Sequence, residues 1–133
     1  MTISPVAKKL WLRPGMRALI VGSPPGYLKL LAPLPHGVSV SHVANGAHSF
    51  VQFFATRASE LRKSGRKLLK HAAVGALVWI AYPKKTSGVA SDLSREAVRD
   101  AMRDTGWRPV AIVSIDEVWS ALRFRPINDV KSR

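Results

Sequence analysis

The sequence predicts one α/β domain, a three-layer Rossmann-like arrangement whose mostly parallel sheet ends in an antiparallel C-terminal hairpin. Three observations support this fold class. Short, nearly continuous apolar runs are typical of strands covered on both faces. Helical segments alternate with these runs, and two strand-like segments follow each other directly at the end of the chain. A length of 133 residues suits a single domain, so we take residues 1–133 as one unit.

Four apolar segments are expected to form the first strands of the sheet. The first follows the Pro14-Gly15 turn and stops at Gly22, and the fourth stops at Pro83. Asn45-Gly46 marks the turn before the third. The expected strands cover residues 16–21, 38–41, 50–54 and 77–82.

Three helices are expected between these strands. Residues 26–34 fit a short helix, and residues 57–72 form the clearest one, with Gly65 on its apolar arc, where we expect a close approach to the sheet. Ser91 or Asp92 is expected to cap the third helix, which runs to Thr105 before Gly106.

The C-terminal part is expected to close the sheet. Residues 110–115 and 118–124 predict an antiparallel hairpin. Strand alternation places Arg123 and Arg125 on one face with Trp119, as an exposed stripe suited either to a contact between two copies of the chain or to pairing with the C-terminal tail. Residues 1–13 are expected to form an N-terminal arm and residues 126–133 a C-terminal tail.

Charge is the unusual feature of the composition. The formal net charge is +13, and residues 1–88 hold 13 cations against one carboxylate, Glu60. A positive field of this size favours encounter with nucleic acid or other anions, although arginine enrichment in a GC-rich genome would produce the same composition. Cysteine is absent, which excludes disulfides and thiolate metal sites. We expect a cytoplasmic protein without a membrane span, because the longest apolar stretch, residues 72–82, is far below the roughly 20 residues required.

The order of elements resembles the class I methyltransferase fold, and residues 68–84 resemble the stretch that those enzymes place before their fifth strand. Nearly the whole chain is similar to a small bacterial domain-of-unknown-function family. This second likeness is carried by Lys9-Leu10 with Arg13-Pro14-Gly15, by Pro24-Pro25-Gly26-Tyr27-Leu28, by Trp79 with Tyr82-Pro83-Lys84, by Ser91-Asp92-Leu93 and by residues 119–125.

The methyltransferase resemblance implies a site for S-adenosylmethionine, with a glycine-rich loop after the first strand and an acid after the second. Here the first loop contains Pro24 and Pro25, which lack backbone N–H donors, and the second strand ends in Ser41-His42 without a carboxylate. We therefore expect no cofactor. The spacing of the four histidines predicts no metal site, and Gly22-Ser23-Pro24 matches only the start of a hydrolase nucleophile elbow.

A first candidate site lies where two loops leave the carboxyl ends of parallel strands, the edge at which open α/β sheets bind ligands. The loops supply ammonium groups, hydroxyls and a tyrosine ring, which suit a phosphate or carboxylate ligand. The candidate residues are Ser23, Gly26, Tyr27, Lys84, Lys85, Thr86 and Ser87.

A second candidate site is the polar face of the helix at residues 57–72. Its cations would attract a nucleic-acid backbone without reading a base sequence, whereas a solvated charged face is the plainer alternative. The four tryptophans are expected in core or edge packing because their neighbours are apolar. The candidate cations are Arg62, Lys63, Arg66, Lys67 and Lys70.

These observations predict a non-catalytic, methyltransferase-like binding or interaction module for an anionic partner, either a nucleic-acid backbone or a small phosphate or carboxylate ligand. The alternative is a small enzyme whose substrate occupies the crevice between residues 22–27 and 84–88.

Overall fold

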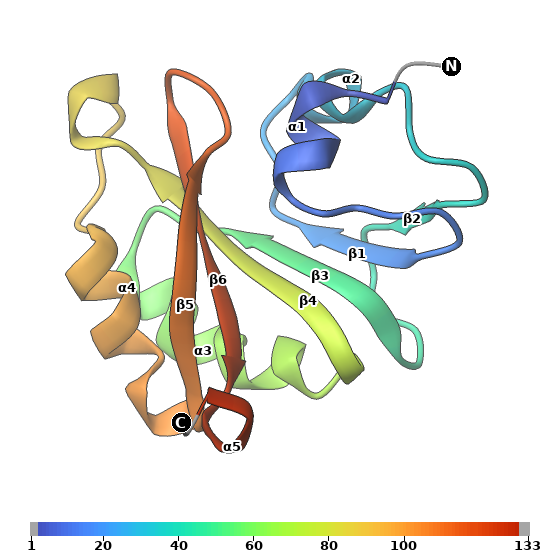
Figure 1. The fold of residues 1–133 in the computed structure, drawn as a ribbon. Coiled ribbons are helices and arrows are strands. Elements are labelled where there is room, and N and C mark those ends of the chain that lie inside the picture. Colours follow the sequence, from blue (N-terminus) through green and yellow to red (C-terminus); the bar gives the residue numbers. More distant parts are fainter. Residues whose placement is uncertain (1–2, 131–133) are drawn as a thin grey trace.

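The computed structural model describes residues 3–130 and contains one six-stranded sheet with the order β2-β1-β3-β4-β6-β5 (Figure 1). Strands β2, β1, β3 and β4 are parallel, and β6 and β5 run antiparallel to their neighbours. This confirms the predicted fold class. The strands are β1 (Arg17–Val21), β2 (Ser39–Ser41), β3 (His48–Phe54), β4 (Ala72–Pro83), β5 (Trp107–Ser114) and β6 (Trp119–Pro126).

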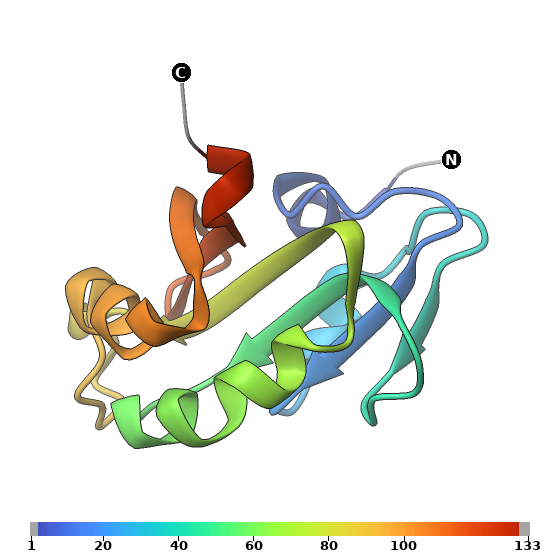
Figure 2. The same cartoon turned by 90° about the horizontal axis from the view of Figure 1, so that it is seen from below.

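Helices cover both faces of the sheet, which gives three layers (Figure 2). Helices α1 (Pro5–Lys9) and α2 (Tyr27–Leu31) pack on one face, and α3 (Ala58–Leu69) and α4 (Arg95–Ala101) pack on the other. Two short 3₁₀ turns, η1 (Lys85–Ser87) and η2 (Arg103–Thr105), and helix α5 (Ile127–Val130) complete the described chain. Between residues 3 and 130, none of the helices has the length and apolar character needed to cross a bilayer.

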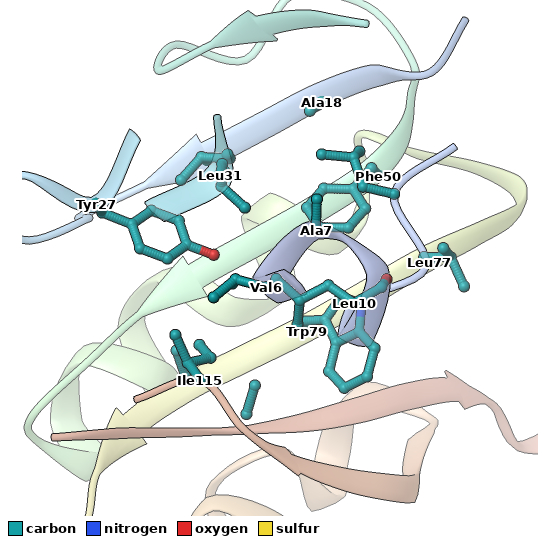
Figure 3. Packing of buried hydrophobic residues seen from close by; sticks show 14 of the residues in the cluster. Val6, Ala7, Leu10, Ala18, Tyr27, Leu31, Phe50, Leu77, Trp79 and Ile115 are labelled. Atoms are coloured by element: carbon teal, nitrogen blue, oxygen red, sulfur yellow. The ribbon is translucent and has the colours of Figure 1, made fainter. Parts of the chain in front are cut away.

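The N-terminal segment is part of the core and not an arm. Helix α1 lies over the centre of the sheet, where Val6, Ala7 and Leu10 pack among residues of β1, β3 and β4 (Figure 3). The indole N–H of Trp79 in β4 donates to the carbonyl oxygen of Leu10 at 3.0 Å. Helix α1 covers this face, and Val6, Ala7 and Leu10 of the expected arm are buried. Residues 1–2 of the expected arm and 131–133 of the expected tail lie outside the described residues.

On the opposite face, α3 packs beside α4, and Gly65 lies between them. A Cβ on Gly65 would lie 2.8 Å from the sulfur of Met102, the residue that ends α4. The close neighbour of Gly65 is therefore the flexible side chain at the end of the adjoining helix. No described atom of the sheet lies within 4 Å of such a Cβ, so the expected close approach to the sheet is wrong.

Helix α4 begins later than predicted. Ser94 caps it, because its hydroxyl accepts the N–H of Ala97 at 3.1 Å. The residues expected to cap, Ser91 and Asp92, bind the start of α3 instead: Ser91 donates to the Thr56 carbonyl, and Asp92 accepts the Ala58 N–H at 2.8 Å. The predicted stop at Gly106 is confirmed by its φ of 83°.

Strand β4 starts five residues earlier than predicted and contains a large bulge. His48 pairs with Ala72 and Phe50 pairs with Leu77, so four residues of β4 bulge out opposite a single residue of β3. Gly75 has a φ of 79°, and the Val74 side chain is fully exposed. The bulge lies at the amino end of β4 and lines a hollow there.

Helix α1 ends in a Schellman motif with a tryptophan in the left-handed position. The N–H of Trp11 donates to the Lys8 carbonyl, and the N–H of Leu12 donates to the Ala7 carbonyl. Trp11 has a φ of 62° and is the one non-glycine residue with a positive φ between residues 3 and 130. Its neighbours Leu10 and Leu12 are buried, whereas Trp11 is 52% exposed. The expectation that all four tryptophans pack in the core or at an edge is therefore wrong for Trp11.

Gly22 lies in the turn after β1, where the backbone passes close to the end of β3. It has a φ of 77°, and a Cβ there would lie 2.9 Å from the carbonyl oxygen of Phe54. Gly88 has a similar φ of 81° but open space around it. We expect Gly88→Ala to lower the free energy of unfolding by about 1–2 kcal/mol through backbone strain alone. Gly22→Ala should cost about 3 kcal/mol or more, because backbone crowding adds to the same strain.

Urea unfolding of both variants measures the difference. Equal losses of unfolding free energy in Gly22→Ala and Gly88→Ala would show that the Phe54 carbonyl does not constrain the turn.

His48 is a buried histidine at the start of β3. Its side chain is 1% exposed, and its Nε2 accepts the N–H of Asn45 at 3.2 Å. Burial, together with the charges of Arg17 and His71, lowers the pKa of His48 below the usual value of 6.5. The folded protein therefore keeps this ring neutral at a pH where the unfolded chain protonates it.

The free energy of unfolding should consequently be highest above pH 6.5 and fall as the pH is lowered below it, because the unfolded state then binds the extra proton. His48→Gln should flatten this dependence, measured by urea unfolding at several values between about pH 7.5 and 5. Replacement of the exposed His36 by glutamine is the matched control and should keep the slope. An unchanged slope in His48→Gln would contradict the assignment.

Candidate functional site

The loop after β1 does not present the tyrosine ring that the sequence predicts for a ligand crevice. Tyr27 is 2% exposed, and its hydroxyl donates to the Gln52 side-chain oxygen at 2.7 Å within the core. Burial raises the pKa of the Tyr27 hydroxyl well above its usual value of 10. The expectation that Tyr27 lines an open crevice is therefore wrong, whereas Ser23 and Gly26 do lie at the surface of the loop.

A row of aromatic side chains occupies the carboxyl edge of the sheet next to this loop. The rings of Tyr27 and Phe54 meet edge to face at 4.7 Å between centroids, and those of Phe54 and Trp119 do so at 5.0 Å. The three residues come from the start of α2, the end of β3 and the start of β6. These rings fill space above three neighbouring strands and tie the edge together.

The residues at this edge do not fit S-adenosylmethionine. Pro24 and Pro25 lack N–H groups, and the N–H of Tyr27 already donates to the Pro24 carbonyl at 3.1 Å. After β2, the ring of His42 lies 2.9 Å from the Ile20 carbonyl oxygen, and no carboxylate follows before Ala44. Neither a donor-rich loop nor an acceptor for ribose hydroxyls is present where the cofactor would require them.

The loop after β4 lies at the same edge of the sheet, but it contacts other residues than the loop after β1 does. It contains Lys84, Lys85, Thr86 and Ser87. The ammonium of Lys84 donates to the Ser114 hydroxyl at 2.6 Å, and the Ser87 hydroxyl accepts the N–H of Val89. Lys84 and Lys85 line two hollows of about 330 and 350 Å³ with residues of β4, α4 and the segment between them. Residues 22–27 line neither hollow, so the two predicted loops do not form one crevice around these lysines.

The five cations predicted on α3 do gather on its outer face. All five side chains are exposed, and within the described chain no carboxylate lies within 4 Å of any of them. Of the five, Arg66 alone donates a side-chain hydrogen bond within residues 3–130, to the Asp104 carbonyl oxygen at 2.7 Å. The residues are Arg62, Lys63, Arg66, Lys67 and Lys70.

Helix α4 shows the opposite arrangement of charge. Arg95 lies 3.4 Å from the carboxylate of Glu96, and Asp100 lies 2.8 Å from Arg103 and 3.8 Å from Arg99. These are exposed pairs, each worth about 1 kcal/mol or less. They nevertheless neutralise the surface of α4, so the two neighbouring helices differ sharply in local charge.

Three carboxylates of the chain accept hydrogen bonds from backbone N–H groups. Glu60 accepts the N–H groups of Thr56 and Arg57 at the start of the helix, and Asp92 accepts that of Ala58. Asp116 accepts the N–H groups of two residues in the turn before β6. These carboxylates fix backbone turns and do not pair with the cations of α3. Among residues 3–130, no group of three or more metal-binding side chains comes together.

The fold is similar to that of solved class I methyltransferases. A S-adenosylmethionine-dependent methyltransferase from Aquifex aeolicus is 18% identical, with 90% of this chain and 86% of that chain covered and a TM-score of 0.59. The ribosomal protein L11 methylase from Lactobacillus delbrueckii subsp. bulgaricus is 11% identical, with 91% and 74% covered and a TM-score of 0.58. An O-methyltransferase from neocarzinostatin biosynthesis is 13% identical, with 92% and 51% covered and a TM-score of 0.64.

No protein-family model and no curated protein matches the sequence. Identities this low establish a shared fold and leave the activity to be argued from the site itself.

Because the cofactor edge lacks donors and a ribose acceptor, we expect no binding of S-adenosylmethionine at physiological concentration. Isothermal titration calorimetry, with an active class I methyltransferase as the positive control, measures this directly. A dissociation constant on the order of tens of micromolar or tighter, which is about 6–7 kcal/mol, would contradict the structural argument.

Proposed function

We propose that this protein is a methyltransferase-like module that binds the phosphate backbone of nucleic acid through the outer face of α3. The observation that carries the proposal is the row of exposed cations on this helix, none of which has a carboxylate within 4 Å among the described residues. Like charges three and four residues apart repel each other on a helix. A polyanion relieves that repulsion and releases its own condensed counterions.

The helix dipole accounts for only part of this charge. Arg66 and Lys67 lie in the last turn of α3, where the dipole favours cations. Arg62 and Lys63 lie nearer the middle of the helix, and their charge has no such explanation. From Lys63 to Lys70 the helix rises by about 10 Å, comparable to three phosphate steps along one strand of a duplex.

The same surface favours binding that does not depend on base sequence. The outer face of α3 carries ammonium and guanidinium groups but no aromatic ring that would stack on a base. Contacts to phosphate fix position and supply affinity, whereas base edges supply specificity. The proposed partner is therefore a nucleic-acid backbone of any sequence.

The alternative of a small enzyme has less support. An enzyme with its substrate between residues 22–27 and 84–88 would need an open crevice, and Tyr27 is buried while Lys84 is engaged with Ser114. We also propose that the chain belongs to the small bacterial domain-of-unknown-function family. This family has no activity that could be assigned to the chain. The proposal therefore rests on the surface of this chain.

Replacing Lys63, Lys67 and Lys70 together by glutamine tests the proposal and spares Arg66, which binds Asp104. Fluorescence anisotropy with labelled duplexes of two unrelated sequences, at several salt concentrations, gives the slope of log K against log salt. We expect both duplexes to bind more weakly to the same extent, and the slope to flatten by about 2–3.

The matched control replaces Arg95 and Arg99 of α4 and Arg103 of the following turn, η2, by glutamine. This variant loses the same net charge, but its arginines lie beside Glu96 and Asp100. We expect a smaller change in slope, since these three arginines share two neighbouring carboxylates, whereas the cations of α3 have none within 4 Å among the described residues. Equal effects of the two triple variants would show that only the net charge matters and would overturn the assignment to α3.

A further inference from the structure

Trp11 stands between two hollows on the α1 side of the sheet. One hollow, of about 410 Å³, is lined by Arg13, Arg123, Arg125, Trp107 and the bulge at residues 72–77. The other, of about 460 Å³, is lined by Lys8, Leu12 and Arg13. Trp11 borders both hollows, and the volume of each suits a small organic ligand. Neither belongs to the face of α3 or to the loop after β4.

The charges around Trp11 all have the same sign. The guanidinium of Arg123 lies over the Trp11 ring, 4.8 Å from its centroid. Arg13 and Arg125 line the same hollow, and no residue lining either hollow is acidic. Burial and the nearby charge of Arg125 lower the pKa of Arg123, so this guanidinium lies where a cation is unfavourable without an anion. An anion is the ligand that this cluster lacks.

The backbone at Trp11 is a second, independent observation. A helix that ends in a Schellman motif uses glycine in the left-handed position at little cost, whereas a bulky side chain there is strained. Trp11 occupies this position with a φ of 62°, and the buried Leu10 and Leu12 on either side turn its ring outward. A strained backbone that displays a half-exposed tryptophan indicates a side chain retained for contact with a ligand.

We propose that the Trp11 site, made by Trp11, Arg13, Arg123 and Arg125, binds a nucleotide unit, with the base stacked on the exposed part of the indole and the phosphate held by the arginines. Indole and guanidinium groups stack on bases, and guanidinium groups bind phosphate in a bidentate manner. A free nucleotide and a nucleotide within a single strand share this chemistry. For a single strand, the inference deepens the nucleic-acid function proposed for α3.

Stacking on the Trp11 ring favours unpaired over paired nucleotides. The Trp11 ring borders two hollows at the end of α1, and the cations belong to α3. Helices α1 and α3 lie on opposite faces of the sheet (Figure 2). In a duplex the bases are stacked on one another and are not available to an indole ring. We therefore expect the Trp11 site to distinguish single strands from duplexes, which the phosphate contacts of α3 do not do.

The test uses the full chain with two probes, adenosine 5′-monophosphate and a fluorescein-labelled single-stranded decamer of deoxyadenylate. Trp11→Asn removes the ring and keeps a residue that tolerates the left-handed conformation. We expect this variant to bind both probes at least tenfold more weakly, and Trp11→Phe to stay within about threefold of the wild type. Adenosine, which lacks the phosphate, should bind at least tenfold more weakly than its monophosphate.

The outcomes separate this site from α3. Loss of decamer binding alone in Trp11→Asn, with no measurable binding of the monophosphate to the wild type, supports the site and identifies single strands as its source of nucleotides. The α3 variant Lys63→Gln, Lys67→Gln, Lys70→Gln should bind the monophosphate as the wild type does, whatever happens to duplex binding. Unchanged affinity of Trp11→Asn for both probes, with circular dichroism showing an intact fold, would overturn the inference.

Discussion

The structure depends on a small number of carboxylates that accept hydrogen bonds from backbone N–H groups. Glu60 and Asp92 together cap the start of α3, and Asp116 fixes the turn into β6. A helix start without such acceptors leaves N–H groups unpaired, which is costly. The chain has only eight acidic residues. Among the described residues, the three used in these turns lie beyond 4 Å from the cations of α3, so the fold places its acceptors at backbone turns and leaves the charge of that helix exposed.

Much of the fold could be predicted because its elements follow simple periodicities. The two-face burial of β1, β3 and β4 gives continuous apolar runs, and the hairpin of β5 and β6 follows from two such runs in succession. The face of α3 also followed from spacing alone, since five cations at helical intervals must share one side. These features depend on residues near each other in the sequence, which a pattern captures.

The parts that could not be predicted depend on contacts between distant residues. Helix α1 was expected to be an arm because a helix of five residues is marginal without packing, here against β4 with Leu10 bonded to Trp79. Ser4 and Pro5 did offer a local helix-start signal, since the Ser4 hydroxyl accepts the N–H groups of Val6 and Ala7. Tyr27 was placed in a crevice because its partners, Gln52 and Phe54, lie more than 20 residues away. Trp11 offered one local signal, since Leu10 and Leu12 flank it, but its conformation depends on how α1 ends.

Both edges of the sheet are poor templates for adding another strand. At one edge β2 has only three residues, and at the other β5 carries Pro109 beside a bulge that interrupts its pairing with β6. A short edge, a proline and a bulge are the devices by which natural sheets resist edge-to-edge association. A protein with five exposed cations on one helix therefore also keeps its hydrogen-bonding edges unsuited to polymerisation. On the partner proposed above, many copies of the chain would be able to lie close together without joining into a continuous sheet.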